Sequence, residues 1–188
     1  TQCGGSPSNE SCFAAYHADR VAIWKRYYDT MQLKSPGTYC ILEHFAENTE
    51  EIELSDYGMM LWGNSNYNFS EASMGWVPTS NFEWYLHTAR GWSKPHVVGY
   101  MESHDEERMM YRNLQFGNTA NASHNVRDLN VALKRIELCA AFLLSAPGPK
   151  MIWQFGELGY DYSINRCVDG TINNNCRLDK KPITWNYK

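Results

Sequence analysis

Short apolar runs alternate along this chain with helical patterns, and polar or charged residues follow most of these runs at once. The runs are predicted to be strands and lie at 38–42, 57–62, 95–101 and 150–154. Strands that alternate with helices are typical of βα units built around a parallel sheet. Continuous apolar strands are expected where both faces of such a sheet are covered. The order of the patterns therefore predicts the α/β fold class.

The helical patterns are predicted at 13–34, 48–54, 81–90, 106–115 and 125–146, whereas 66–80 is predicted to be irregular. The last helix is the clearest, because apolar residues recur along one broad face between Val126 and Leu144. A complete (β/α)8 barrel takes about 250 residues, and this chain has 188. Four βα units of this length make about half a barrel. An open half would expose a sheet edge and apolar faces, so we expect a homodimer, swapped elements, a complementing half barrel, or a piece of a longer protein.

The composition argues against two classes of function. The formal net charge is -4, whereas a nucleic-acid-binding surface needs a basic face. The chain has no run of about 18 apolar residues, so we expect no membrane span. Aromatic residues make up 14% of the chain. This content fits either surfaces that stack on sugar rings or a core rich in Trp and Tyr.

The cysteines are placed unevenly. Cys3 and Cys12 bracket one short polar loop, and Cys167 and Cys176 bracket another. We predict two disulfides that close these loops, which would indicate an oxidising compartment. The other two cysteines, Cys40 and Cys139, lie in apolar segments and are predicted to be buried thiols. The Cys and His spacings do not match a zinc site, so we predict no metal site.

Carboxylates follow three of the predicted strands. They are Glu43, Asp105 with His104 beside it, and Glu157. In parallel sheets this end of the strands carries the active site. Two carboxylates in one cleft suit acid/base chemistry, because their surroundings can separate their pKa values. A glycosidase needs such a pair. For each residue the alternative is a structural role, in which it caps a helix or pairs with an Arg.

The motifs that carry these carboxylates resemble, in order, those of the α-amylase family of glycoside hydrolases. They are Ile41-Leu42-Glu43-His44, Tyr100-Met101-Glu102-Ser103-His104-Asp105, and the run from Pro147 to Glu157. The resemblance covers about 13–187 and is similar to secreted or surface amylases of Bacteroidetes. It implies a (β/α)8 TIM barrel of which this chain forms strands five to eight. Residues 1–188 would then be a partial catalytic domain, with the N-terminal half and a C-terminal β domain outside it.

The resemblance also implies roles for single residues. Glu43 matches the general acid/base of retaining hydrolysis of α-1,4-glucosidic bonds in starch-like glucans. Asp105 matches the residue that stabilises the transition state, and His104 matches a histidine that hydrogen-bonds the sugar. His44 and Trp62 are further candidates for substrate binding. The family's nucleophile, an Asp in a Gly-x-Arg-x-Asp motif, is missing from this sequence and would lie upstream.

The resemblance further implies a secreted or cell-surface protein and a structural calcium ion in the full-length enzyme. Three alternatives stay open at this point. The chain could be a transglycosylase of the same family, or an inactive, truncated module that binds glucan. It could also be an unrelated α/β protein whose motifs match by coincidence.

Overall fold

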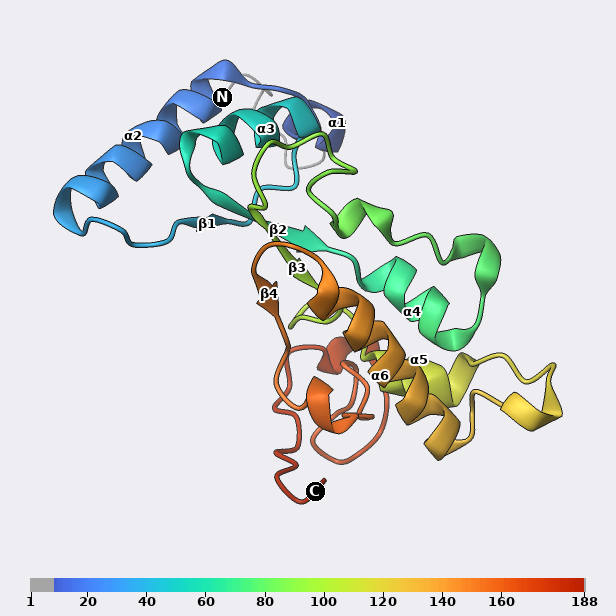
Figure 1. Ribbon diagram of the computed structural model, residues 1–188. Helices are drawn as coiled ribbons and strands as arrows, with labels where there is room; N and C mark the ends of the chain where they lie inside the picture. Colours follow the sequence, from blue (N-terminus) through green and yellow to red (C-terminus); the bar gives the residue numbers. More distant parts are fainter. Residues whose placement is uncertain (1–8, 188) are drawn as a thin grey trace.

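The computed structural model describes residues 9–187, which form an α/β fold around a four-stranded parallel sheet (Figure 1). The strands are β1 (Ile41–Leu42), β2 (Met60–Asn64), β3 (Val97–Tyr100) and β4 (Lys150–Met151). The α-helices are α1 (Glu10–Ala14), α2 (Ala18–Lys34), α3 (Asn48–Tyr57), α4 (Asn66–Met74), α5 (Met109–Phe116) and α6 (Leu129–Ser145). The predicted α/β class with a parallel sheet is confirmed.

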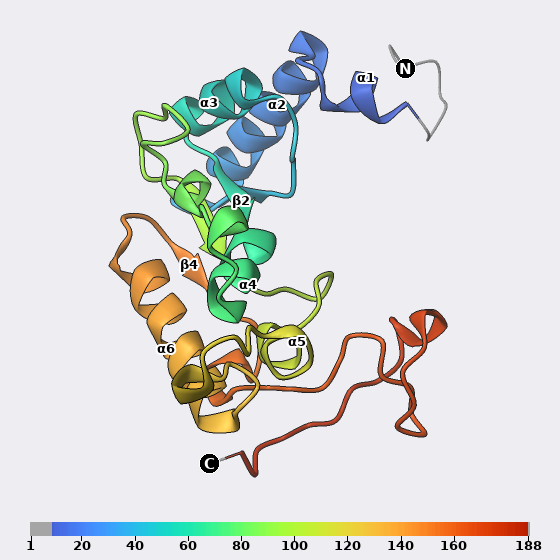
Figure 2. The ribbon, with the colours of Figure 1, turned by 90° about the vertical axis from the view of Figure 1, so that its right-hand side faces the viewer.

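Each strand pairs with the next one along the chain, in the order β1-β2-β3-β4. Doubly wound sheets reverse their strand order at a switch point, and the four described strands contain no such reversal. Helices α2 and α3 pack beside β1 and β2, while α4, α5 and α6 pack on one another next to β3 and β4 (Figure 1). After β4 the chain runs away from α6 to the turn at Asn174–Cys176 (Figure 2).

The register of the strands separates the two faces of the sheet. Leu42, Leu61 and Val97 lie side by side in the ladder and share one buried cluster with the helices. Because side chains alternate along a strand, the next residue of each strand points to the opposite face. That face holds Trp62 and Tyr100, whose rings meet edge to face at 5.8 Å between centroids. We call it the inner face.

Two predictions of local structure between β2 and β3 were wrong. The segment 66–80 begins with helix α4, because Asn66 donates to the carbonyls of Met101 and Glu107 and Phe69 is fully buried beneath it. The predicted helix 81–90 is only a short 3-10 turn, Glu83–Tyr85. There, hydrogen bonds within the segment and to other elements take the place of a regular helical ladder.

The predicted helix 13–34 is divided into α1 and α2. His17 has an extended backbone, and its N–H donates to Glu50 at 2.8 Å. Because of this break, the carbonyls of Phe13 and Ala15 do not accept helical backbone hydrogen bonds. The guanidinium of Arg20 donates to both of them instead. Tertiary contacts to α3 therefore override the continuous helical pattern.

Helix α6 begins at Leu129, later than predicted, because Asp128 accepts hydrogen bonds from the N–H groups of Asn130 and Val131 and caps it. Helix α5 likewise begins at Met109. The apolar face predicted for the last helix is only partly buried. Ala132 and Leu143 are buried, whereas Leu129, Leu133 and Leu144 are exposed. Part of this face has no covering layer among the described residues.

The cysteines agree in part with the prediction. Cys167 and Cys176 form a disulfide, whereas Cys3 of the other predicted pair lies outside the described residues. Cys139 is a buried free thiol as predicted, whereas Cys40 is a free thiol that is only partly buried, packed against the cluster around Leu42. Among the helices of 9–187, none combines the length and the apolar character needed to cross a membrane.

Candidate active site

A cavity of about 450 Å³ lies on the inner face, at the carboxyl ends of the strands. We call it the Glu43 cavity. Its lining residues come from all four strand ends and are Glu43, Phe45, Trp62, Asn64, Tyr100, Ser103, His104, Asp105, Glu106, Met151 and Trp153. The predicted site residues Glu43, Trp62, His104 and Asp105 are therefore in one place. The chain carries them there on three separate strands, whose ends meet at one edge of the sheet.

The cavity wall is strongly acidic. Burial raises the pKa of the Tyr100 hydroxyl, and the negative charges of Glu106, Glu43 and Asp105 raise it further. Glu106 accepts hydrogen bonds from Asn64, at 2.5 Å, and from the hydroxyl of Ser103. These hydrogen bonds hold the Glu106 side chain in the wall of the cavity. The other two carboxylates of the wall, Glu43 and Asp105, are the ones predicted from the sequence.

Asp105 is held by a residue that lies far along the chain. The guanidinium of Arg177 donates to the side chain and to the backbone carbonyl of Asp105, both at 2.7 Å. His104 lies on its other side, with 3.3 Å between Nε2 and the carboxylate. Arg177 directly follows Cys176 of the disulfide. Sequence reasoning missed Arg177, because nothing in the local pattern connects this loop with the end of β3.

His44 does not line the Glu43 cavity. Its side chain is 3% exposed, and Nε2 lies 2.6 Å from Glu50, which is fully buried at the start of α3. Arg20 also donates to Glu50, at 2.6 Å. Burial raises the pKa of Glu50, but hydrogen bonds from Arg20, the His17 N–H and His44 outweigh it and lower that pKa overall. Burial lowers the pKa of His44. The buried Glu50 cluster thus anchors the residue next to Glu43.

Glu51, the neighbour of Glu50, anchors the same loop from a second direction. Its carboxylate is 3.2 Å from the buried guanidinium of Arg90. It also interacts with the backbone N–H groups of Ala46 and Phe45, and burial raises its pKa overall. Phe45 has a positive φ of 48°, which is uncommon for a residue other than Gly. Two buried carboxylates therefore hold the chain in an unusual conformation directly after Glu43.

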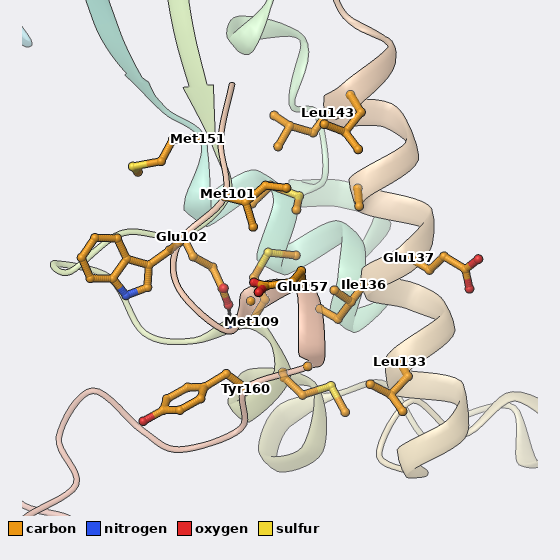
Figure 3. A pocket seen from close by; sticks show the side chains of 17 residues that line it. Met101, Glu102, Met109, Leu133, Ile136, Glu137, Leu143, Met151, Glu157 and Tyr160 are labelled. Carbon is orange, nitrogen blue, oxygen red and sulfur yellow. Dashed lines mark hydrogen bonds between the residues drawn. The ribbon is translucent and has the colours of Figure 1, made fainter. Parts of the chain in front are cut away.

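Glu157, the third predicted strand-end carboxylate, lies at a different cavity. This second cavity, of about 420 Å³, lies between α6 and the segment after β4 (Figure 3). Apolar side chains such as Met101, Met109 and Ile136 dominate its lining, and Glu102 also reaches it. Glu102 is buried, and its Oε1 accepts the Met109 N–H at 2.5 Å. A Cβ on Gly156 would come within 2.7 Å of its other oxygen, so this position favours glycine.

Replacing Glu102 by Gln is expected to stabilise the fold at pH 7. Burial raises the pKa of Glu102, so the folded chain binds this proton more tightly than the unfolded chain. Stability is then lost as the pH rises from about 4.5 through the folded pKa. Gln is neutral and can still accept the Met109 N–H. We expect a gain of roughly 1 kcal/mol, or about 2–4 °C in melting temperature, by thermal unfolding at pH 7.

Glu137→Gln is the matched control, because Glu137 lines the same cavity but is exposed. Its melting temperature should stay within about 1 °C of the parent chain. A lower melting temperature for Glu102→Gln, or an equal gain in both variants, would contradict the prediction.

One group of potential metal ligands lies together within residues 9–187. It comprises Cys167, Cys176 and Asp179. The two cysteines are bonded to each other, so their sulfur atoms are not thiolate ligands. The group is therefore part of the disulfide loop.

Comparisons with known proteins identify no family for this chain. A scan against models of protein families finds no match to the sequence. A search of curated proteins finds no significant match either. The motifs and the geometry of the Glu43 cavity are therefore the features of this chain that bear on its function.

Proposed function

We propose that this chain is the second half of a glycoside-hydrolase barrel of the α-amylase type, acting on the α-1,4 bonds of starch-like glucans. The observation that carries the proposal is the Glu43 cavity. Two carboxylates selected from separate motifs, Glu43 and Asp105, line one cavity together with His104 and Trp62. This set contains an acid/base candidate, a second carboxylate, and an aromatic ring on which a sugar can stack.

The barrel part of the proposal draws support from the sheet and from α6. In a (β/α)8 barrel each strand pairs in parallel with the next strand along the chain. The four strands β1 to β4 pair in this way. The exposed leucines of α6 need a covering layer. A complementing half barrel would supply that layer and the nucleophile, and a homodimer would cover the apolar faces. The Cys167–Cys176 disulfide supports a secreted or cell-surface location.

In the proposed mechanism, Glu43 protonates the glycosidic oxygen as the bond to the anomeric carbon breaks. An Asp from outside this chain attacks that carbon and forms a glycosyl-enzyme intermediate. Glu43 then acts as a base and takes a proton from the water that releases the sugar, with retention of configuration. Asp105 accepts hydrogen bonds from sugar hydroxyls, and these bonds strengthen as charge develops in the transition state.

Calorimetric titration of the 188-residue chain with maltoheptaose, and with cellohexaose as the β-linked control, tests the substrate class. We expect saturable binding of the α-linked glucan only, and loss of most of that binding in Trp62→Ala. Trp153→Ala tests a second aromatic residue of the same cavity, in case one of the two variants fails to fold. Equal binding of both glucans, or none of either, would overturn the proposal.

Reducing-sugar release from soluble starch, with Glu43→Gln alongside, tests the chemistry. We expect no turnover by the chain alone, because the nucleophile is supplied from outside it. Turnover that Glu43→Gln abolishes would overturn the external nucleophile while keeping Glu43 as the acid. Transfer to an acceptor sugar in place of hydrolysis would favour the transglycosylase.

A further inference from the structure

A third cavity, of about 280 Å³, adjoins the Glu43 cavity. Phe45 and Asn64 line both of them, so the two cavities have a common wall. The remaining walls come from the start of α3 and from the irregular segment before β3, and they include Asn48 and Trp84. We call it the Trp84 cavity. None of its walls belongs to the motifs that suggested glycoside hydrolysis.

The exposed ring of Trp84 is firmly held. It is 52% exposed, yet its backbone carbonyl accepts a 2.6 Å hydrogen bond from Nε of Arg90. The guanidinium carbon of Arg90 also lies 5.3 Å from the centre of the Trp84 ring and 5.3 Å from that of Trp92. Arg90 is itself buried. The buried Arg90 guanidinium therefore packs against the Trp84 ring, which remains partly exposed to solvent.

The other exposed ring of this cavity depends on the same buried pair. Glu51 is ion-paired with Arg90, and it also interacts with the backbone N–H of Phe45. Phe45 is 48% exposed. Burying an ion pair carries a desolvation free energy that can exceed the gain from Coulomb attraction between the two charges. The Glu51–Arg90 pair is therefore a poor source of stability. Its structural effect is to hold Phe45 and Trp84 in place around one cavity.

We propose that the Trp84 cavity is a second sugar subsite, which binds a glucose unit further along the glucan than the unit at Glu43. Rigid aromatic rings present a flat apolar face, which suits the C–H face of a pyranose. The side-chain oxygens of Asn48 and Asn64 each accept one hydrogen bond within the protein. Each carries a second lone pair that can accept a sugar hydroxyl. This inference rests on the proposed function.

The test compares a short and a long α-glucan, maltotriose and maltoheptaose, by calorimetric titration. In Trp84→Ala we expect maltoheptaose to bind about tenfold more weakly, with maltotriose unchanged, because only the longer glucan reaches both cavities. Trp84→Tyr should recover most of the loss. Trp185→Ala is the matched control, since Trp185 is more exposed than Trp84 and lines neither cavity.

The outcomes separate this inference from the proposed function. If the parent chain binds neither glucan, the proposed function is wrong. If it binds both, and Trp84→Ala weakens both equally or neither, the second subsite is wrong and the proposed function stands. Trp84→Leu removes the flat ring but keeps an apolar side chain at a residue that lines the Trp84 cavity and not the Glu43 cavity. It decides between these outcomes if Trp84→Ala does not fold.

Discussion

Glu50→Ala is expected to lower the free energy of unfolding by about 3–5 kcal/mol at pH 7. Glu50 is fully buried and accepts hydrogen bonds from Arg20 and from the His17 N–H, while His44 lies 2.6 Å from it. Removing the carboxylate leaves these groups in a protein interior without their partner. Because a domain has a total stability of about 5–15 kcal/mol, this loss is large. Urea unfolding followed by Trp fluorescence measures it.

The pH dependence follows from the lowered pKa of Glu50. The folded chain binds this proton less tightly than the unfolded chain, so the stabilisation is complete above about pH 4.5. It is lost as the pH falls through the folded pKa. The stability difference between the parent chain and Glu50→Ala should therefore shrink in acid.

Glu53→Ala provides the matched control on the same helix. Glu53 pairs with Lys25 at 2.5 Å, but both side chains are partly exposed, so we expect a cost below about 1 kcal/mol. If the Glu50 variant costs no more than the Glu53 variant, the cluster does not anchor the loop after Glu43.

Asp105→Ala is expected to weaken maltoheptaose binding by about 10- to 100-fold. Hydrogen bonds to a charged group contribute about 1.5–3 kcal/mol each, and about 1.4 kcal/mol corresponds to a factor of ten. The substitution also removes the carboxylate that Arg177 binds at 2.7 Å, which leaves that guanidinium with only the backbone carbonyl of residue 105 as its partner there. Calorimetric titration at fixed salt concentration measures the effect.

Glu157→Ala is the control for this prediction. Glu157 also follows a predicted strand, but it lines the cavity between α6 and the segment after β4. Maltoheptaose should bind this variant as it binds the parent chain. If Asp105→Ala and Glu157→Ala weaken maltoheptaose binding to a similar extent, the prediction is wrong. The effect of Asp105→Ala would then not come from a contact with the glucan in the Glu43 cavity.

Much of the candidate site could be predicted from the sequence, because parallel strands end at one edge of a sheet. This rule brings Glu43, His104 and Asp105 together. The position of His44 shows where the reasoning was incomplete. Successive side chains along an extended chain point to opposite sides. If Glu43 faces the cavity, the residue after it faces away, and His44 does so toward Glu50.

The local patterns were least informative between β2 and β3. Helix α4 lies where an irregular segment was predicted, and the predicted helix 81–90 is mostly irregular. In both places long-range contacts decide the backbone. Asn66 hydrogen-bonds the chain beyond β3, and the carbonyl of Arg90 accepts from Asn48 across 42 positions of sequence.

The sequence by itself determined the order of the four strands, the helices outside the stretch between β2 and β3, and the strand ends that carry carboxylates, because these depend on periodicity within short windows. Only the tertiary structure placed Arg177 against Asp105, Glu50 beneath His44, and Trp84 beside Phe45. These contacts form when separate elements pack together. Local sequence patterns do not encode which distant side chains will share a cavity.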